Sequence, residues 1–203
     1  HAFALAPLAA MADHKAANVL VIYSNGRLLP ANVEGDRGLR EALSGGAGPA
    51  VNVFDEFLDV PRFSGAAFQA LMSTYLREKY AAQRPSVIVA GGPEALTFCL
   101  ANRAELFPGV PIVHMAVSDV FLGKLGRLPA DVQGVPIVYE FARTIEQALA
   151  WHPQARHLVL VTGASPQDRE WEAQLRREVP RFTARVHPEF LAGLTTPAVQ
   201  QRL

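Results

Sequence analysis

A strand, a glycine turn and a helix N-terminus follow one another in the middle of this chain. Residues 85–90 are Pro-Ser-Val-Ile-Val-Ala, and their length and β-branched content predict a strand buried on both faces, which is typical of parallel sheets. Gly91 and Gly92 permit positive φ and a close backbone approach, and Pro93 suits the first position of a helix. Because open α/β sheets bind ligands at the carboxyl ends of their strands, this segment indicates a binding site.

Strand and helix patterns alternate along the rest of the chain. We expect strands near residues 18–23, 50–54, 85–90, 110–117, 134–139, 157–162 and 182–187, with helices in most of the intervals between them. Alternation of this kind predicts an α/β fold, in which a parallel sheet carries helices on both faces.

The pattern restarts after Tyr139, which suggests two lobes. Residues 18–139 hold about five predicted strands and form the first lobe, whereas residues 140–203 hold about two. A two-stranded sheet is a weak unit by itself. We therefore expect residues 140–203 to be part of a truncated second α/β lobe that continues past Leu203, and a homodimer would be one way to cover its open edge.

The first 17 residues are rich in alanine and do not begin with methionine. Ala10-Met11-Ala12 matches the small-x-small pattern of a signal-peptide cleavage site. We interpret residues 1–17 as a signal-peptide remnant or a flexible arm, and the first reading places the domain outside the cytoplasm. Because the sequence has no run of about 18 apolar residues, a membrane would be reached only through segments outside it.

Composition and motifs exclude several chemistries. Lys plus Arg and Asp plus Glu each number 19 and form no basic stripe, so nucleic acid is not an expected partner. Cys99 is the only cysteine and lies in an apolar helical run, where we expect a buried small hydrophobe. No two histidines have the spacing of a helical zinc site, and nucleotide-binding and serine-hydrolase motifs are absent. We therefore expect no metal, no cofactor and no catalytic residue.

The carboxyl ends of the predicted strands define the candidate site. Helix N-termini at Pro93 and Pro166 would offer N–H groups to a carboxylate or another anion. Asp119 would receive an ammonium group, and Tyr23 would stack on an apolar body. The predicted ligand-binding residues are Tyr23, Ser24, Asn25, Gly91, Gly92, Pro93, Glu94, His114, Ser118, Asp119, Thr162, Gly163, Ser165 and Asp168.

Each of these assignments has a structural alternative. Ser165 and Asp168 stand where they would cap a helix, and for Ser165 we favour that role. Gly91 and Gly92 would equally form an ordinary tight turn. His114 is more typical of a core or cleft-lining histidine than of a metal ligand.

Seven motifs occur in order between Asn18 and Leu191. They are Val-Leu-Val-Ile-Tyr-Ser (19–24), Phe-Leu-Asp (57–59), Arg-Glu-Lys-Tyr (77–80), Pro-Ser-Val-Ile-Val-Ala-Gly-Gly-Pro-Glu-Ala-Leu (85–96), Glu-Leu-Phe-Pro-Gly-Val-Pro-Ile-Val (105–113), Leu-Pro-Ala-Asp-Val-Gln-Gly-Val (128–135) and Leu-Val-Leu-Val-Thr-Gly-Ala-Ser (158–165). In this order they resemble the periplasmic sensor domains of certain bacterial hybrid histidine kinases. Those domains are similar to ABC-transporter substrate-binding proteins, some of which take aromatic amino acids. The resemblance implies a class I periplasmic-binding-protein fold of flavodoxin-like type, with a ligand cleft between two lobes.

Three functions follow from these expectations. The first is a non-enzymatic, extracytoplasmic sensor domain of a two-component histidine kinase, which binds a small molecule such as an amino acid or carboxylate and signals by lobe closure. The alternative is the substrate-binding protein of an ABC transporter. The third is a small-molecule enzyme of flavodoxin-like fold, which would need a nucleophile or cofactor that the sequence does not reveal.

Overall fold

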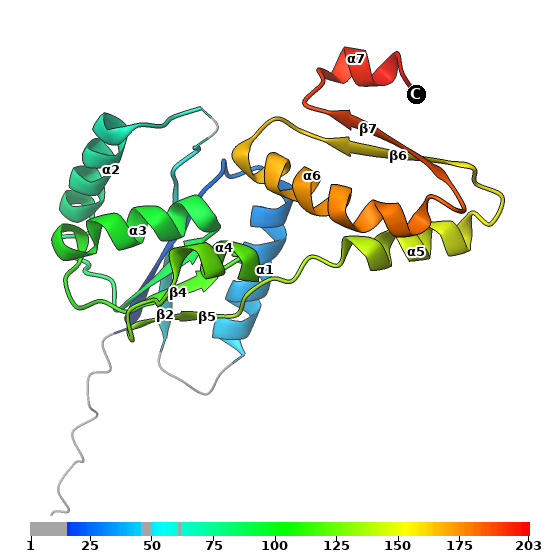
Figure 1. The fold of residues 1–203 in the computed structure, drawn as a ribbon. Coiled ribbons are helices and arrows are strands. Elements are labelled where there is room, and N and C mark those ends of the chain that lie inside the picture. The colour runs from blue at the N-terminus through cyan, green and yellow to red at the C-terminus, as the bar shows by residue number, and fades with distance from the viewer. Residues whose placement is uncertain (1–15, 46–49, 61) are drawn as a thin grey trace, which may run out of the picture. The chain divides into compact units, whose positions relative to one another are not determined.

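The computed structural model describes residues 16–45, 50–60 and 62–203 (Figure 1). The chain divides into two compact units between Ile137 and Val138, and each unit is described by itself below. Residues 1–15 of the predicted N-terminal arm lie outside the described residues, and Ala17 already belongs to the first strand. No helix in the described ranges has the length and apolar character needed to cross a membrane.

The first unit contains a five-stranded parallel sheet in the order β2-β1-β3-β4-β5. The strands are β1 (Ala17–Tyr23), β2 (Val51–Phe57), β3 (Val87–Gly91), β4 (Ile112–Met115) and β5 (Val132–Gly134). This strand order is that of flavodoxin-like sheets. The predicted fold class is therefore confirmed.

Helices cover both faces of this sheet (Figure 1). The α2 (Ala66–Lys79), α3 (Pro93–Leu106) and α4 (Asp119–Leu125) helices pack on the face that carries Leu20 and Ile22 of β1. The α1 helix (Pro30–Ser44) packs on the opposite face, where Leu39 meets Val19 and Val21. Because β1 is covered on both sides, all of its residues from Asn18 to Tyr23 are buried, which explains its nearly continuous apolar sequence.

The second unit is a smaller α/β arrangement. It comprises α5 (Phe141–Trp151), β6 (His157–Thr162), α6 (Pro166–Glu178), a 3-10 turn at Val179–Phe182, β7 (His187–Ala192) and α7 (Thr196–Gln200). The β6 and β7 strands pair in parallel. The side chains of Ile145, Leu149, Leu160, Leu175, Val179 and Val186 form its core.

Two predicted strands differ from the structure. In place of the strand expected at 134–139, the structure has the short strand β5, which ends at Gly134. Pro136 interrupts the pairing after it, and Ile137 forms an isolated bridge to Ser118. The strand expected at 182–187 is a 3-10 turn followed by a loop, and pairing begins at His187. Val179 and Val186 are buried there as core residues of a turn, and a short apolar run does not distinguish this role from a strand.

Candidate functional site

The carboxyl ends of β1, β3 and β4 lie side by side in the first unit. Tyr23 is in register with Gly91, and Gly91 is in register with Met115. Backbone pairing continues past these ends, because the Ser24 N–H donates to the Gly91 carbonyl and the Gly92 N–H donates to the Met115 carbonyl, each at 2.9 Å. The fold therefore brings Ser24, Gly91 and Gly92 together, as expected for neighbouring parallel strands.

Ser24 caps the α3 helix from a remote strand. Its side chain is buried, and its Oγ accepts a hydrogen bond from the Ala95 N–H at 2.9 Å. Gly92 has φ 105°, and a Cβ added there would lie 2.5 Å from the Ser24 Oγ. Ser24 thus occupies one of the helix N–H groups that the sequence suggested for an anion, and the contact requires glycine at position 92.

Tyr23 faces the core beneath α1. It is 1% exposed, its ring stacks on Phe57 with centroids 5.2 Å apart, and its hydroxyl donates to Asp36 at 3.4 Å. Burial and the nearby Asp36 and Asp55 carboxylates raise the pKa of the Tyr23 phenol. The structure therefore leaves no exposed face of this ring for the predicted stacking on a ligand.

Ser118 and Asp119 begin the α4 helix. The Ser118 Oγ accepts from the Phe121 N–H at 3.1 Å, and the Asp119 carboxylate accepts from the Val120 N–H at 2.7 Å. Asp119 is exposed, whereas Ser118 is buried. Ala116, just before them, has φ +56°, a conformation that costs a non-glycine residue about 1–3 kcal/mol and that gathers at functional sites.

Two of the predicted residues of the second unit, Ser165 and Asp168, form a helix cap. The Ser165 Oγ accepts from the Asp168 N–H at 3.1 Å, and the Asp168 carboxylate accepts from the Ser165 N–H at 3.0 Å. This reciprocal pair is a capping box, which is the structural alternative favoured for Ser165. Gly163 lies against the Asp168 carboxylate, and Thr162 ends β6 with its Oγ1 buried and without a partner in the described part of the chain.

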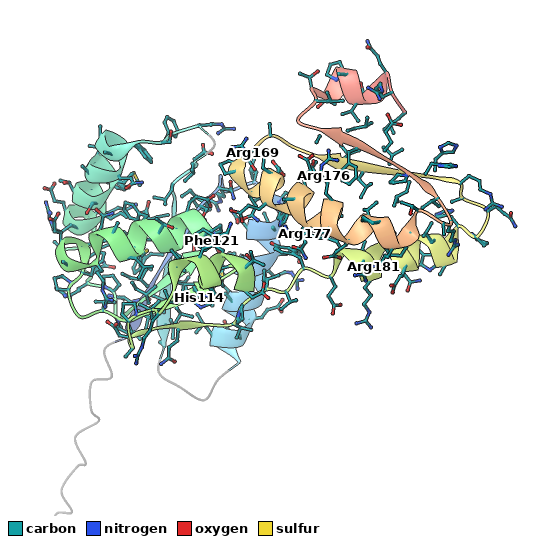
Figure 2. All side chains as sticks on the ribbon, in the orientation of Figure 1. His114, Phe121, Arg169, Arg176, Arg177 and Arg181 are labelled. Carbon is teal, nitrogen blue, oxygen red and sulfur yellow. The ribbon has the colours of Figure 1, made fainter. Side chains whose placement is uncertain are left out.

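An apolar pocket that the sequence did not reveal opens beside this edge of the first sheet. It measures about 160 Å³ and lies where the β2–α2 loop and the first turns of α2, α3 and α4 converge. Its lining residues are Leu58, Val60, Phe63, Ser64, Gly65, Phe68, Gln69, Glu94, Thr97, Phe98 and Phe121. Figure 2 labels Phe121, which comes from α4. Of the predicted site residues, Glu94 alone lines this pocket.

A second hollow of about 790 Å³ adjoins the pocket and shares Leu58, Phe63 and Phe68 with it. Asn25 lines this hollow, so two predicted residues, Asn25 and Glu94, lie at adjoining concave sites. Arg62 also lines it and is paired with the Asp59 carboxylate at 2.9 Å. Asp59 has φ +48°, so a second strained non-glycine residue lies at this edge of the sheet.

His114 lies away from both hollows. It is 4% exposed on β4, against Gly134, and its Nδ1 is buried without a hydrogen-bond partner among the described residues (Figure 2). Burial disfavours the charged imidazolium and lowers the pKa of His114 below its ordinary value.

Cys99 is buried, as expected, and burial raises the pKa of its thiol to about 12, which leaves the thiol unreactive at neutral pH.

Because His114 resists protonation in the folded state, we expect stability to fall in mild acid. The pKa of His114 is lower in the folded protein than in the unfolded chain. His114 therefore does not reduce the free energy of unfolding above about pH 6.5, but it lowers this free energy by at most about 1.4 kcal/mol per pH unit as the pH falls toward the folded pKa. Urea unfolding from about pH 5 to pH 8 measures the slope of the free energy of unfolding against pH. His114→Gln should flatten it, whereas the exposed His152→Gln should not; an unchanged slope in His114→Gln would contradict the assignment.

No protein-family model matches the chain, and no curated protein matches it either. Solved structures of similar fold include three of bacterial origin. They are a conserved domain protein from Vibrio cholerae (17% identity, TM-score 0.64), an ABC domain in complex with L-Trp from Streptococcus pneumoniae (14%, 0.62), and the ligand-free, open form of a substrate-binding protein with adhesive properties from Clostridium difficile (15%, 0.56). Each comparison covers 92% of this chain and 60% of the other. The chain thus spans about 60% of their length, and at these identities the likeness concerns the fold.

Proposed function

We propose that this chain is a ligand-binding domain of the substrate-binding-protein type, which holds a small molecule at the carboxyl edge of its first sheet and works outside the cytoplasm. The observation that carries the proposal is the apolar pocket formed at this edge by the first turns of three helices. In open parallel sheets the carboxyl edge is the usual place for a ligand.

The pocket favours a ligand with a compact apolar body. Four of its lining residues are the phenylalanines at positions 63, 68, 98 and 121. A volume of about 160 Å³ is close to that of an apolar cavity that admits one benzene molecule, about 150 Å³. One aromatic ring or a branched alkyl group of similar size would therefore fill it.

Transport is better supported than kinase signalling. One similar structure is a complex with L-Trp and another is described as a substrate-binding protein, whereas nothing in the three comparisons points to a kinase. The sensor-domain reading, which the sequence resemblance placed first, thus becomes the second candidate. The enzymatic reading is weakened because Cys99 is buried and because Ser24, Ser118 and Ser165 each cap a helix.

A thermal-shift screen with amino acids, small carboxylates, amines and sugars tests the proposal. A compound that binds only the folded protein must raise the melting temperature as its concentration exceeds Kd, and we expect this for compounds with an apolar body. Gln69→Trp would place an indole at the pocket and abolish the shift, whereas Thr74→Trp, exposed on the same helix and outside the pocket lining, would preserve it. A screen without any shift, or a shift that survives Gln69→Trp, would contradict the proposal.

A further inference from the structure

Among the described residues, Glu94 is the one ionisable residue that lines the pocket, and its carboxylate has no partner among them. Across the described ranges, the side chain of Glu94 forms no ion pair or hydrogen bond, although Glu94 is only partly exposed. Arg27 and Arg62 line the adjoining hollow, and Arg62 is paired with Asp59; within the described ranges neither arginine forms an ion pair with Glu94. The helix dipole also stabilises a carboxylate in the first turn of a helix, but this stabilisation does not require an aromatic pocket beside the carboxylate.

The aromatic walls complement a positive charge as well as an apolar body. Phe63 and Phe68 stack with centroids 5.5 Å apart, and Phe98 and Phe121 come from two other helices. The faces of aromatic rings attract cations within about 6 Å of the ring centre, and cages of such rings recognise ammonium groups. A cation in this small pocket would meet several rings and one free carboxylate.

An anionic group, by contrast, finds little to bind in this pocket. None of the lysines and arginines in the described part of the chain lines it. Two of the helix N–H groups near it are already used, because the Ala95 N–H donates to Ser24 and the Phe121 N–H donates to Ser118. The N-terminus of α2 has no side-chain cap, but an anion bound there would still be desolvated opposite the Glu94 carboxylate.

We infer that the ligand presents an ammonium group on a compact apolar body to this pocket, with Glu94 as its counter-ion and the four phenylalanines as its walls. This inference rests on the proposed function and specifies the chemical class of its ligand. Glu94 is then the residue that sets charge specificity, while the rings supply binding that does not depend on charge.

Three compounds with one phenyl body and different charges test the inference: 2-phenylethylamine, 2-phenylethanol and 3-phenylpropionate. Calorimetric titration of the full chain should give a Kd for the amine at least about tenfold lower than that of the alcohol, because hydrogen bonds to charged groups are the stronger ones. The carboxylate should bind more weakly than the alcohol. Glu94→Gln should bring the amine and the alcohol to similar affinity, whereas Glu105→Gln, exposed at the other end of α3, should keep the preference for the amine.

Each other result overturns the inference in a recognisable way. Equal affinity of the amine and the alcohol for the original chain would show that the pocket does not distinguish a charged ligand from a neutral one. A preference that persists in Glu94→Gln would assign it to another group. If none of the three compounds binds while a different compound passes the Gln69→Trp test, the inference fails and the proposed function stands; if nothing passes that test either, both fail.

Discussion

Gly92→Ala should lower the free energy of unfolding of the first unit by about 3 kcal/mol or more. Gly92 has φ 105° and ψ 165°, a region that is essentially restricted to glycine and costs other residues about 1–3 kcal/mol. The new Cβ would also lie 2.5 Å from the Ser24 Oγ and 3.0 Å from its Cβ, and such overpacking typically costs a further 1–3 kcal/mol or so. Urea unfolding followed by far-UV circular dichroism measures the loss.

Gly65→Ala is the matched control for this experiment. Gly65 has nearly the same backbone conformation, with φ 96° and ψ 163°, but a Cβ added there meets no atom within 4 Å. Its loss should therefore report backbone strain alone, and the difference between the two variants should report the contact with Ser24. Equal losses in the two variants would mean that the Ser24 contact carries no energy.

Leu20→Ala should destabilise the protein by about 3–5 kcal/mol, the upper part of the range for buried leucines. Leu20 is fully buried in β1, an interior strand of the sheet, and it packs in the cluster that joins the sheet to α2 and α3. Removing three carbons there leaves a cavity that the two covering layers resist filling.

Leu71→Ala provides the comparison, because Leu71 lies on α2 but is 66% exposed. Its change should stay within about 0.5 kcal/mol. Urea unfolding of the original chain, Leu20→Ala and Leu71→Ala under one set of conditions measures the two losses in the free energy of unfolding. A loss in Leu20→Ala no larger than that in Leu71→Ala would contradict the described core.

Local patterns were sufficient to predict most of the fold. The strand at 87–91, the turn at Gly91-Gly92 and the helix starting at Pro93 follow from residue types that are adjacent in sequence. Leu71 and Tyr75 stand at helical spacing among the apolar residues of α2, yet both are exposed. Periodicity identifies a helix, but the width of its buried face depends on what packs against it.

The candidate site was less predictable, for two physical reasons. Serines after a strand indicate a ligand edge and a helix cap equally well, and the hydrogen bonds of Ser118 and Ser165 show the capping role. The pocket, in turn, depends on Phe63, Phe98 and Phe121, which come from three parts of the chain. A local sequence pattern does not predict that residues so far apart in the chain lie together in the fold.

The bond between Ser24 and Ala95 also bears on how the first unit acquires its structure. Its two residues are separated by 71 positions, and they meet where the paired strands β1 and β3 end side by side. Closing so long a loop costs entropy before the contact repays it. We therefore expect the start of α3 to be completed late in folding, after β1 and β3 have paired, and the edge that carries the pocket to take its final form only then.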